Sequence, residues 1–217
     1  MISLFVLSSI LCKFKFQILF LPVKPATFSA LSFMAPSLAT LLTPLGMLGG
    51  GVLGLLGYMS GIALFKTFGL PTFMGALSWH VWNNNAYADW RRYALSLGLP
   101  AASIMLFACH PVGQDAFVYT AYWLIPAVTA FLIPRQPAGL FKKILIALNT
   151  TFISHAVGSL LVLYTVHTES LFWIALIPRV AIERSVSVAG MVSIAYLMER
   201  LLATRSTRVV RQYWQIN

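Results

Sequence analysis

Six stretches of mainly apolar residues run along this chain, and they constrain its fold more than any other feature. They cover residues 26–43, 45–65, 93–110, 115–133, 143–166 and 171–199. A helix needs about 20 apolar residues to cross the hydrocarbon of a bilayer, where it satisfies all its own backbone hydrogen bonds. Charged residues form only 9% of the chain, against about 25% in soluble proteins. The sequence therefore predicts an all-α, polytopic membrane bundle of six transmembrane helices.

The basic residues lie on one side of this predicted bundle. The connections and chain ends on that side carry Lys13, Lys15, Lys24, Lys66, Arg91, Arg92, Arg135, Lys142, Lys143, Arg200, Arg205, Arg208 and Arg211. The opposite connections, "TPLG", "HPVGQD" and "VHTES", contain no Lys or Arg. Because Lys and Arg are enriched in cytoplasmic loops, both termini are expected in the cytoplasm. The net charge of +10 is spread between apolar stretches rather than gathered on one polar face, so no nucleic-acid partner is expected.

The expected membrane domain covers 25–200 and is followed by a basic cytoplasmic tail over 201–217. At the N-terminus an apolar run precedes the lysines, which is the reverse of a signal peptide. Residues 1–24 are therefore expected to form an extension, either an interfacial helix or an extra span, and Lys13 and Lys15 favour the interface. Segment 67–92 contains Pro and Gly and ends in polar residues, which suggests a re-entrant or surface helix.

The last predicted span contains charges where lipid disfavours them. If the helix begins near Leu171, Arg179 lies about 12 Å and Arg184 about 20 Å along its axis. Arg179 and Glu183 are four residues apart and can meet on one face, with Arg184 about 100° around the helix. One interpretation is a structural ion pair with a snorkelling Arg184. The other, which we favour, is a polar cavity inside the bundle.

The preceding span supports the cavity because it carries a polar stripe. Asn149, Thr151, Ser154, His155 and Ser159 all lie on it, and a short connection makes it the antiparallel neighbour of the charged helix. We expect Arg179 to attract an anionic group, Glu183 to hold Arg179, and His155 and Asn149 to donate directional hydrogen bonds. The walls of this substrate site are assigned to Tyr119, Tyr122 and Trp123.

No catalytic pattern is found. The four histidines, at positions 80, 110, 155 and 167, lack the close spacing of a metal motif, and no metal site or cofactor is expected. The sequence "HAVGS" has no nucleophile signature, and no phosphate-binding loop is present. The sequence predicts a protein that is not an enzyme.

Small residues repeat at four-residue spacing on the first two predicted spans. They are Ala26 and Ala30, Ala35 and Ala39, then Gly46, Gly50 and Gly54, and, one register over, Gly57 and Gly61. Such faces allow close approach of another helix, either within the bundle or from another protein.

With its "ATFSALSFMAPSLAT" helix, its "PLGMLGGGVLGLLG" helix and its polar last spans, the chain resembles the substrate-binding S components of energy-coupling factor (ECF) transporters. The resemblance covers about residues 25–200, although Pro36 inside the first motif and the N-terminal extension depart from the family pattern. It implies a prokaryotic inner-membrane protein that captures a vitamin or micronutrient near its outer side. It also implies that Ala35 and Ala39, with Ala26 and Ala30, dock to a membrane coupling protein driven by ATPase subunits.

The sequence thus predicts a solute-binding subunit of a small-molecule uptake transporter. The alternative is a membrane scaffold or assembly subunit, in which the charges form a buried pair and the small-residue faces bind other proteins.

Overall fold

The computed structural model describes residues 15–18, 26–29, 63–85 and 87–216, with side chains between 70 and 200. Outside the helices of this part, two short strands, β1 (Lys15–Ile18) and β2 (Ala26–Ser29), pair antiparallel with Lys15 opposite Ser29. A helix was expected to begin at residue 26, and its first four residues are extended instead. Polar and apolar residues alternate in "KFQI", which is the pattern of a strand and accounts for β1. Residues 26–29 pair with this strand and are extended like it.

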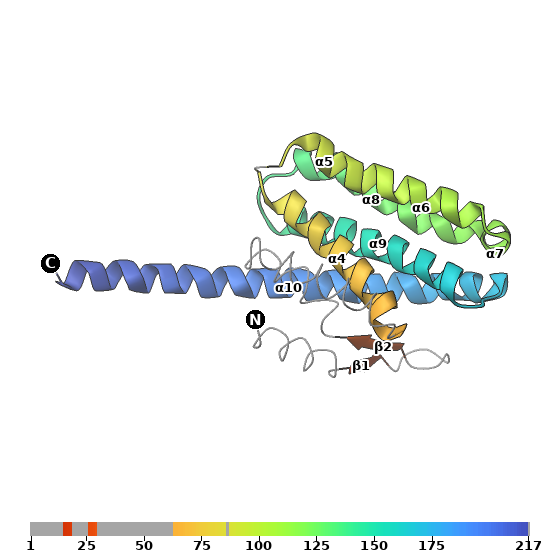
Figure 1. The fold of residues 1–217 in the computed structure, drawn as a ribbon. Coiled ribbons are helices and arrows are strands. Elements are labelled where there is room, and N and C mark those ends of the chain that lie inside the picture. Colours follow the sequence, from red (N-terminus) through yellow and green to blue (C-terminus); the bar gives the residue numbers. More distant parts are fainter. Residues whose placement is uncertain (1–14, 19–25, 30–62, 86, 217) are drawn as a thin grey trace.

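The helices follow one another with short connections (Figure 1). They are α4 (Ala63–Asn83), α5 (Asp89–Tyr93), the π-helix η1 (Ala94–Gly98), α6 (Leu99–Ala108), α7 (Pro111–Asp115), the 3-10 helix η2 (Phe117–Leu124), α8 (Ile125–Leu132), the 3-10 turn η3 (Ile133–Arg135), α9 (Leu140–Thr165) and α10 (Ser170–Ile216). Proline lies in the first turn of α6, α7, α8 and η3. Proline suits that position because the first helical N–H groups have no partner within the helix.

Helix α9 is the centre of the bundle. It packs against α4, α6, α8 and α10, and the last of these continues well beyond the bundle (Figure 1). The predicted antiparallel packing of 143–166 and 171–199 is therefore confirmed. Helix α4 approaches α9 closely because small residues lie at the crossing. A Cβ added to Gly75 would lie 3.2 Å from Ser154 Cβ, and one added to Gly158 would lie 3.5 Å from Pro71 Cγ.

The segment 67–92 is less broken than the sequence suggested. Helix α4 continues through Pro71 and ends only at Asn83, before a turn leads into α5. Residues 67–83 are therefore helical, and this helix is not among those long and apolar enough to cross a membrane; whether it is re-entrant or on the surface stays a prediction. Gly158 leaves room for the Pro71 ring where α4 crosses α9.

Three helical segments of the described part are long and apolar enough to cross a membrane. They are Phe117–Arg135, Leu140–Thr165 and Ser170–Arg200, and they coincide with the last three predicted spans. The predicted span 93–110 is helical within α5, η1 and α6, but it is not among these three. The predicted spans 26–43 and 45–65 lie outside the described residues, except for β2 and the first turn of α4.

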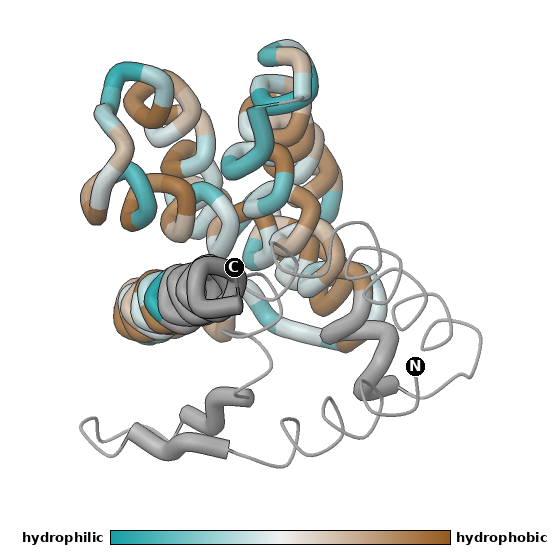
Figure 2. The backbone as a smooth tube through the Cα atoms, turned by 90° about the vertical axis from the view of Figure 1, so that its left-hand side faces the viewer, coloured by the Kyte–Doolittle hydropathy of each residue, from teal (hydrophilic) through white to brown (hydrophobic). Residues whose placement is uncertain are grey.

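Apolar residues recur along all the described helices (Figure 2). Many large apolar side chains are exposed, among them Met105, Leu106, Phe117, Val118, Val128, Phe131, Leu171, Ile174 and Leu197. Such a surface is unfavourable in water and favourable in contact with lipid tails. Together with the three long apolar helices, it supports membrane association.

Candidate functional site

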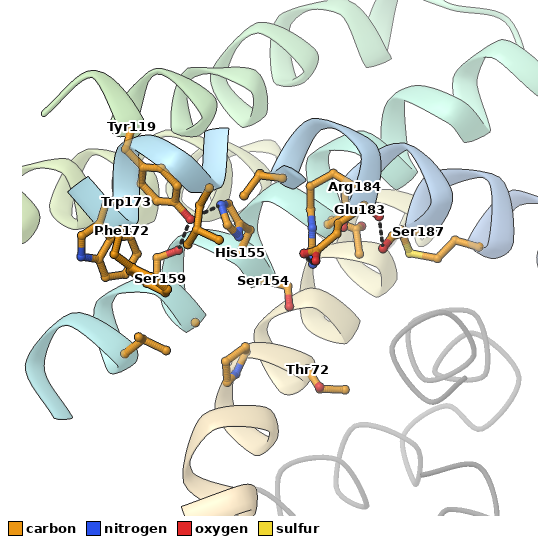
Figure 3. Close-up of a pocket in the computed structure, with 18 residues that line it drawn as sticks. Thr72, Tyr119, Ser154, His155, Ser159, Phe172, Trp173, Glu183, Arg184 and Ser187 are labelled. Carbon is orange, nitrogen blue, oxygen red and sulfur yellow. Dashed lines mark hydrogen bonds and ion pairs between the residues drawn. The ribbon is translucent and has the colours of Figure 1, made fainter. Parts of the chain in front are cut away.

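A cavity of about 430 Å³ lies between α4, α9 and α10, with one wall from η2. Its volume is in the range of small-molecule sites, about 300–1,000 Å³. The lining residues are Pro71, Thr72, Tyr119, Thr150, Thr151, Ser154, His155, Gly158, Ser159, Val162, Phe172, Trp173, Leu176, Val180, Glu183, Arg184, Ser187 and Met191. Figure 3 shows Tyr119, Phe172 and Trp173 at one end, Glu183, Arg184 and Ser187 at the other, and His155 between them.

The charged end of the cavity is built from three neighbouring ionic side chains. Glu183 accepts a hydrogen bond from Arg179 Nε at 2.8 Å, and its other carboxylate oxygen lies 3.8 Å from Arg184 Nη2. Arg184 Nη1 reaches across to α9 and donates to Thr151 Oγ1 at 3.3 Å. With two guanidinium groups and one carboxylate, this end carries one net positive charge. It can therefore stabilise an anion inside the bundle.

Two of the residues that line the cavity each have a buried polar atom without a hydrogen-bond partner. Among the described residues, the buried side-chain atoms with no partner are Trp79 Nε1, His110 Nδ1, Trp123 Nε1, Thr150 Oγ1 and Arg184 Nε. Only those of Thr150 and Arg184 belong to cavity-lining residues. An unpartnered buried donor typically costs about 1–3 kcal/mol. Each of these two atoms has less than 1 Å² of accessible surface, so a bound acceptor would satisfy them once the side chains that cover them shift.

The opposite end of the cavity is aromatic. The hydroxyl of Tyr119 forms hydrogen bonds with His155 Nε2 at 3.0 Å and with Ser159 Oγ at 3.2 Å. The ring of Trp173 lies edge-on to that of Tyr119, with 5.0 Å between ring centroids. His155 and Ser159 share one face of α9, as their spacing predicted, and Thr151 lies one turn away on the same face. The Tyr119 hydroxyl thus links His155 and Ser159. The rings of Tyr119, Phe172 and Trp173 form an aromatic wall at this end of the cavity.

Three of the predicted site residues, Tyr119, His155 and Glu183, line the cavity together. Arg179 does not line it, and its side chain is 34% exposed. The predicted pairing of Arg179 with Glu183 is confirmed. However, the 100° step from Glu183 to Arg184 turns the second guanidinium toward α9. Arg184, not Arg179, therefore presents the positive charge to the cavity.

Asn149 lies away from the cavity, in a buried polar cluster of its own. Its Oδ1 accepts hydrogen bonds from Ser78 Oγ at 2.9 Å and from Ser96 Oγ at 3.1 Å. Its Nδ2 donates to the backbone oxygen of Pro126 at 2.9 Å and to Thr129 Oγ1 at 3.0 Å. Because a backbone carbonyl can only accept, Pro126 fixes the orientation of the amide. Asn149 thus joins α4, η1, α8 and α9.

Tyr122 and Trp123 stand outside the lining as well. The hydroxyl of Tyr122 donates to the backbone oxygen of Ile177 at 2.7 Å, and its ring stacks on Phe152. Trp123 is fully buried, with its ring edge-on to Phe107. These two aromatics support the cavity wall from behind and do not face the cavity.

Lining residues absent from the predicted site include Thr150, Thr151, Ser154, Trp173 and Arg184. The polar stripe and the charged triplet did contain some of these, but no sequence signal indicates which arginine faces α9. Of the alanines expected to dock a partner, Ala26 lies in β2, while Ala30, Ala35 and Ala39 lie outside the described residues.

The described residues contain no group of three His, Cys, Asp or Glu side chains that could hold a metal ion. What the cavity offers is a guanidinium, a carboxylate, hydroxyl groups, one imidazole and aromatic rings. In comparisons with known protein families, curated proteins and solved structures, the chain has no significant match.

Proposed function

We propose that this protein binds a small anionic solute within the membrane and serves as the solute-binding subunit of an uptake transporter. The observation that carries the proposal is Arg184, which lines the cavity with its Nε buried and unpartnered. A buried guanidinium without full hydrogen bonding is unfavourable unless a ligand completes its partners. A purely structural cation would be expected to be fully paired by the protein.

In this mechanism Arg184 attracts the anion and forms charge-assisted hydrogen bonds with it. Thr151 holds one guanidinium nitrogen, and Glu183 lies close enough to orient the group. Arg179 binds the other oxygen of Glu183 and so keeps that carboxylate from neutralising Arg184 completely. The aromatic end excludes water from the rest of the solute.

The distribution of charge favours entry of the solute from outside. Arg91 and Arg92 of α5, Arg135 of η3 and Lys143 at the start of α9 belong to elements that meet at one end of the bundle (Figure 1), where Lys143 pairs with Glu199 of α10. Lys66 was expected on the same side, but it lies in the first turn of α4, at the opposite end of that helix from α5. The turns around α7 and between α9 and α10 lie at the other end (Figure 1) and contain no Lys or Arg. The positive-inside rule assigns the basic end to the cytoplasm. The aromatic end of the cavity then faces outward, and the charged end lies deeper.

The resemblance to S components assigns energy coupling to partner subunits, a membrane coupling protein with ATPases, in a prokaryotic inner membrane. A second candidate function, a membrane scaffold, is favoured by α10, whose 47 residues extend beyond the bundle. In that case the continuation of α10 would hold partner proteins, and the paired charges would be structural.

Native mass spectrometry of the protein purified gently from its own host tests the proposal. We expect a retained stoichiometric anion that is lost from Arg184→Lys and kept in Arg200→Lys. The control makes the same substitution on the same helix, outside the cavity lining. An empty, folded protein that co-purifies with partners other than ATPases would replace the transport proposal with the scaffold.

A further inference from the structure

The geometry around Arg184 points to a narrower ligand class. We infer that the cavity binds an elongated monocarboxylate with an apolar, preferably aromatic, body; this inference rests on the proposed function. The charged end selects the carboxylate, and the length and lining of the cavity select the body.

A carboxylate ligand is indicated by two N–H donors of Arg184 that have no hydrogen-bond partner in the protein. Its Nη1 is held by Thr151, but its Nε has no partner and its Nη2 lies 3.8 Å from Glu183, too far for a hydrogen bond. Nε–H and Nη2–H point in the same direction on one edge of a guanidinium. Two parallel donors match the two oxygens of a carboxylate, and an ammonium group offers no such fork. The unpartnered hydroxyl of Thr150, which is only 1% exposed, adds a further polar atom to the lining.

Charge balance favours a single negative charge. Arg179 and Arg184 together contribute two positive charges, and Glu183 removes one of them. A monoanion neutralises the remaining charge. A phosphate dianion would leave an unbalanced negative charge close to Glu183, and such repulsion is strong away from water. The site therefore favours a carboxylate over a phosphate.

The length of the ligand follows from the spacing along α9. Thr151, the partner of Arg184, and Ser159, the partner of Tyr119, are eight residues apart. At 1.5 Å per residue, the charged and aromatic ends are separated by about 12 Å. Val162, Leu176 and Val180 add apolar surface to the lining. A solute as small as acetate would satisfy Arg184 and leave most of the cavity unfilled.

The aromatic end favours a ring over a polar group. The hydroxyl of Tyr119 already bonds His155 Nε2 and Ser159 Oγ, so these three atoms do not require a polar ligand. Phe172 and Trp173 offer ring faces and edges beside them. Aromatic pairs gain free energy beyond that of the area they bury. A ligand with a terminal aryl group would gain this contribution, and an alkyl chain of equal length would not.

The test measures binding of defined probes to the full chain in lipid nanodiscs by equilibrium dialysis. The probes are 3-phenylpropanoate, 6-phenylhexanoate, the amide of 6-phenylhexanoate, and an alkanoate of matched length. We expect 6-phenylhexanoate to bind at least tenfold more tightly than both the shorter acid and the amide, and several-fold more tightly than the alkanoate. In Arg184→Lys the advantage of the acid over the amide should fall at least tenfold, whereas Arg200→Lys should retain it.

Each outcome has a distinct meaning. Equal binding of acid and amide would overturn the inference that the ligand is a carboxylate. Equal binding of the short and long acids would overturn the inference that its body is elongated. If native mass spectrometry finds a retained anion that is not a carboxylate, the proposed function stands and this inference fails. If no metabolite is retained and no probe binds, both fail.

Discussion

Two polar clusters lie next to each other on α9, and they differ in how completely their hydrogen bonds are made. The cluster around Asn149 is buried and the amide makes four hydrogen bonds to α4, η1 and α8. The cluster beside it, around Thr150 and Arg184, borders the cavity and includes two buried atoms without partners. Asn149 and Thr150 are consecutive residues, yet they face different neighbours.

The comparison shows that polarity inside a membrane helix does not by itself identify a binding site. Buried polar groups are normally satisfied, because each unsatisfied one is destabilising. A saturated cluster therefore fixes the packing of its helices. A cluster with open donors beside a cavity is destabilising by itself and becomes favourable when a ligand completes it. Stability and ligand affinity should thus respond oppositely to substitutions in the two clusters.

The largest effect is expected for Asn149→Leu. Leucine is similar in size but makes none of the four hydrogen bonds, and it leaves the hydroxyls of Ser78 and Ser96 without their acceptor. Hydrogen bonds between membrane helices contribute about 0.6–1.7 kcal/mol each, so the free energy of unfolding should fall by about 2–4 kcal/mol. Thermal unfolding in detergent measures it, with Asn85→Leu, an exposed residue of the turn after α4, as the control. If the variant keeps the normal melting temperature but loses ligand binding, Asn149 is a binding residue, as the sequence predicted.

The next effect, for Glu183→Gln, separates stability from affinity. Neutralising this carboxylate leaves the guanidinium groups of Arg179 and Arg184 without an ionic partner. Because the pairs are partly exposed, we expect a loss of about 1–3 kcal/mol of stability. Binding of a carboxylate probe should become several-fold tighter, since the local positive charge rises from one to two. Probe dialysis beside thermal unfolding checks both signs, and weaker binding of the acid would show that Glu183 contacts the ligand favourably.

The sequence predicted the parts of this arrangement that depend on local spacing. The last three spans, the pairing of Arg179 with Glu183 and the shared face of His155 and Ser159 all follow from hydropathy and from four-residue periodicity. Which arginine faces α9 depends on the rotation of α10 against its neighbour, and no local pattern specifies that rotation. The same limitation explains why the sequence predicted Asn149 as a site residue. Its partners Ser78 and Ser96 are more than 50 residues away in the chain, so no local pattern indicates the cluster that they form.

A smaller effect, of opposite sign, is expected for Thr150→Val. Valine has nearly the same shape and removes a buried hydroxyl that has no partner. Without ligand, the free energy of unfolding should stay constant or rise by up to about 1 kcal/mol. Binding of the carboxylate probe should weaken several-fold if the hydroxyl donates to it. The matched control is Thr129→Val, which removes a partner of Asn149 and should lower stability by about 1 kcal/mol. Equal losses in both variants would mean that Thr150 belongs to a satisfied cluster.

The smallest effect is expected where the cavity meets the crossing of α4 and α9. A methyl group at Gly158 would lie 3.5 Å from Pro71 Cγ, which is ordinary contact, so Gly158→Ala should raise the free energy of unfolding by about 0.5 kcal/mol, because alanine is the better helix former. Gly158 also lines the cavity, so the methyl group should weaken the long acid about two-fold and leave the short acid unchanged. The comparison variant is Gly75→Ala, whose added methyl group would lie 3.2 Å from Ser154 Cβ, so that the neighbouring helix must shift by a few tenths of an ångström. That variant should lower stability and affect both acids alike. A uniform loss for the long and short acids in Gly158→Ala would mean that the ligand body does not pass this residue on its way to Tyr119.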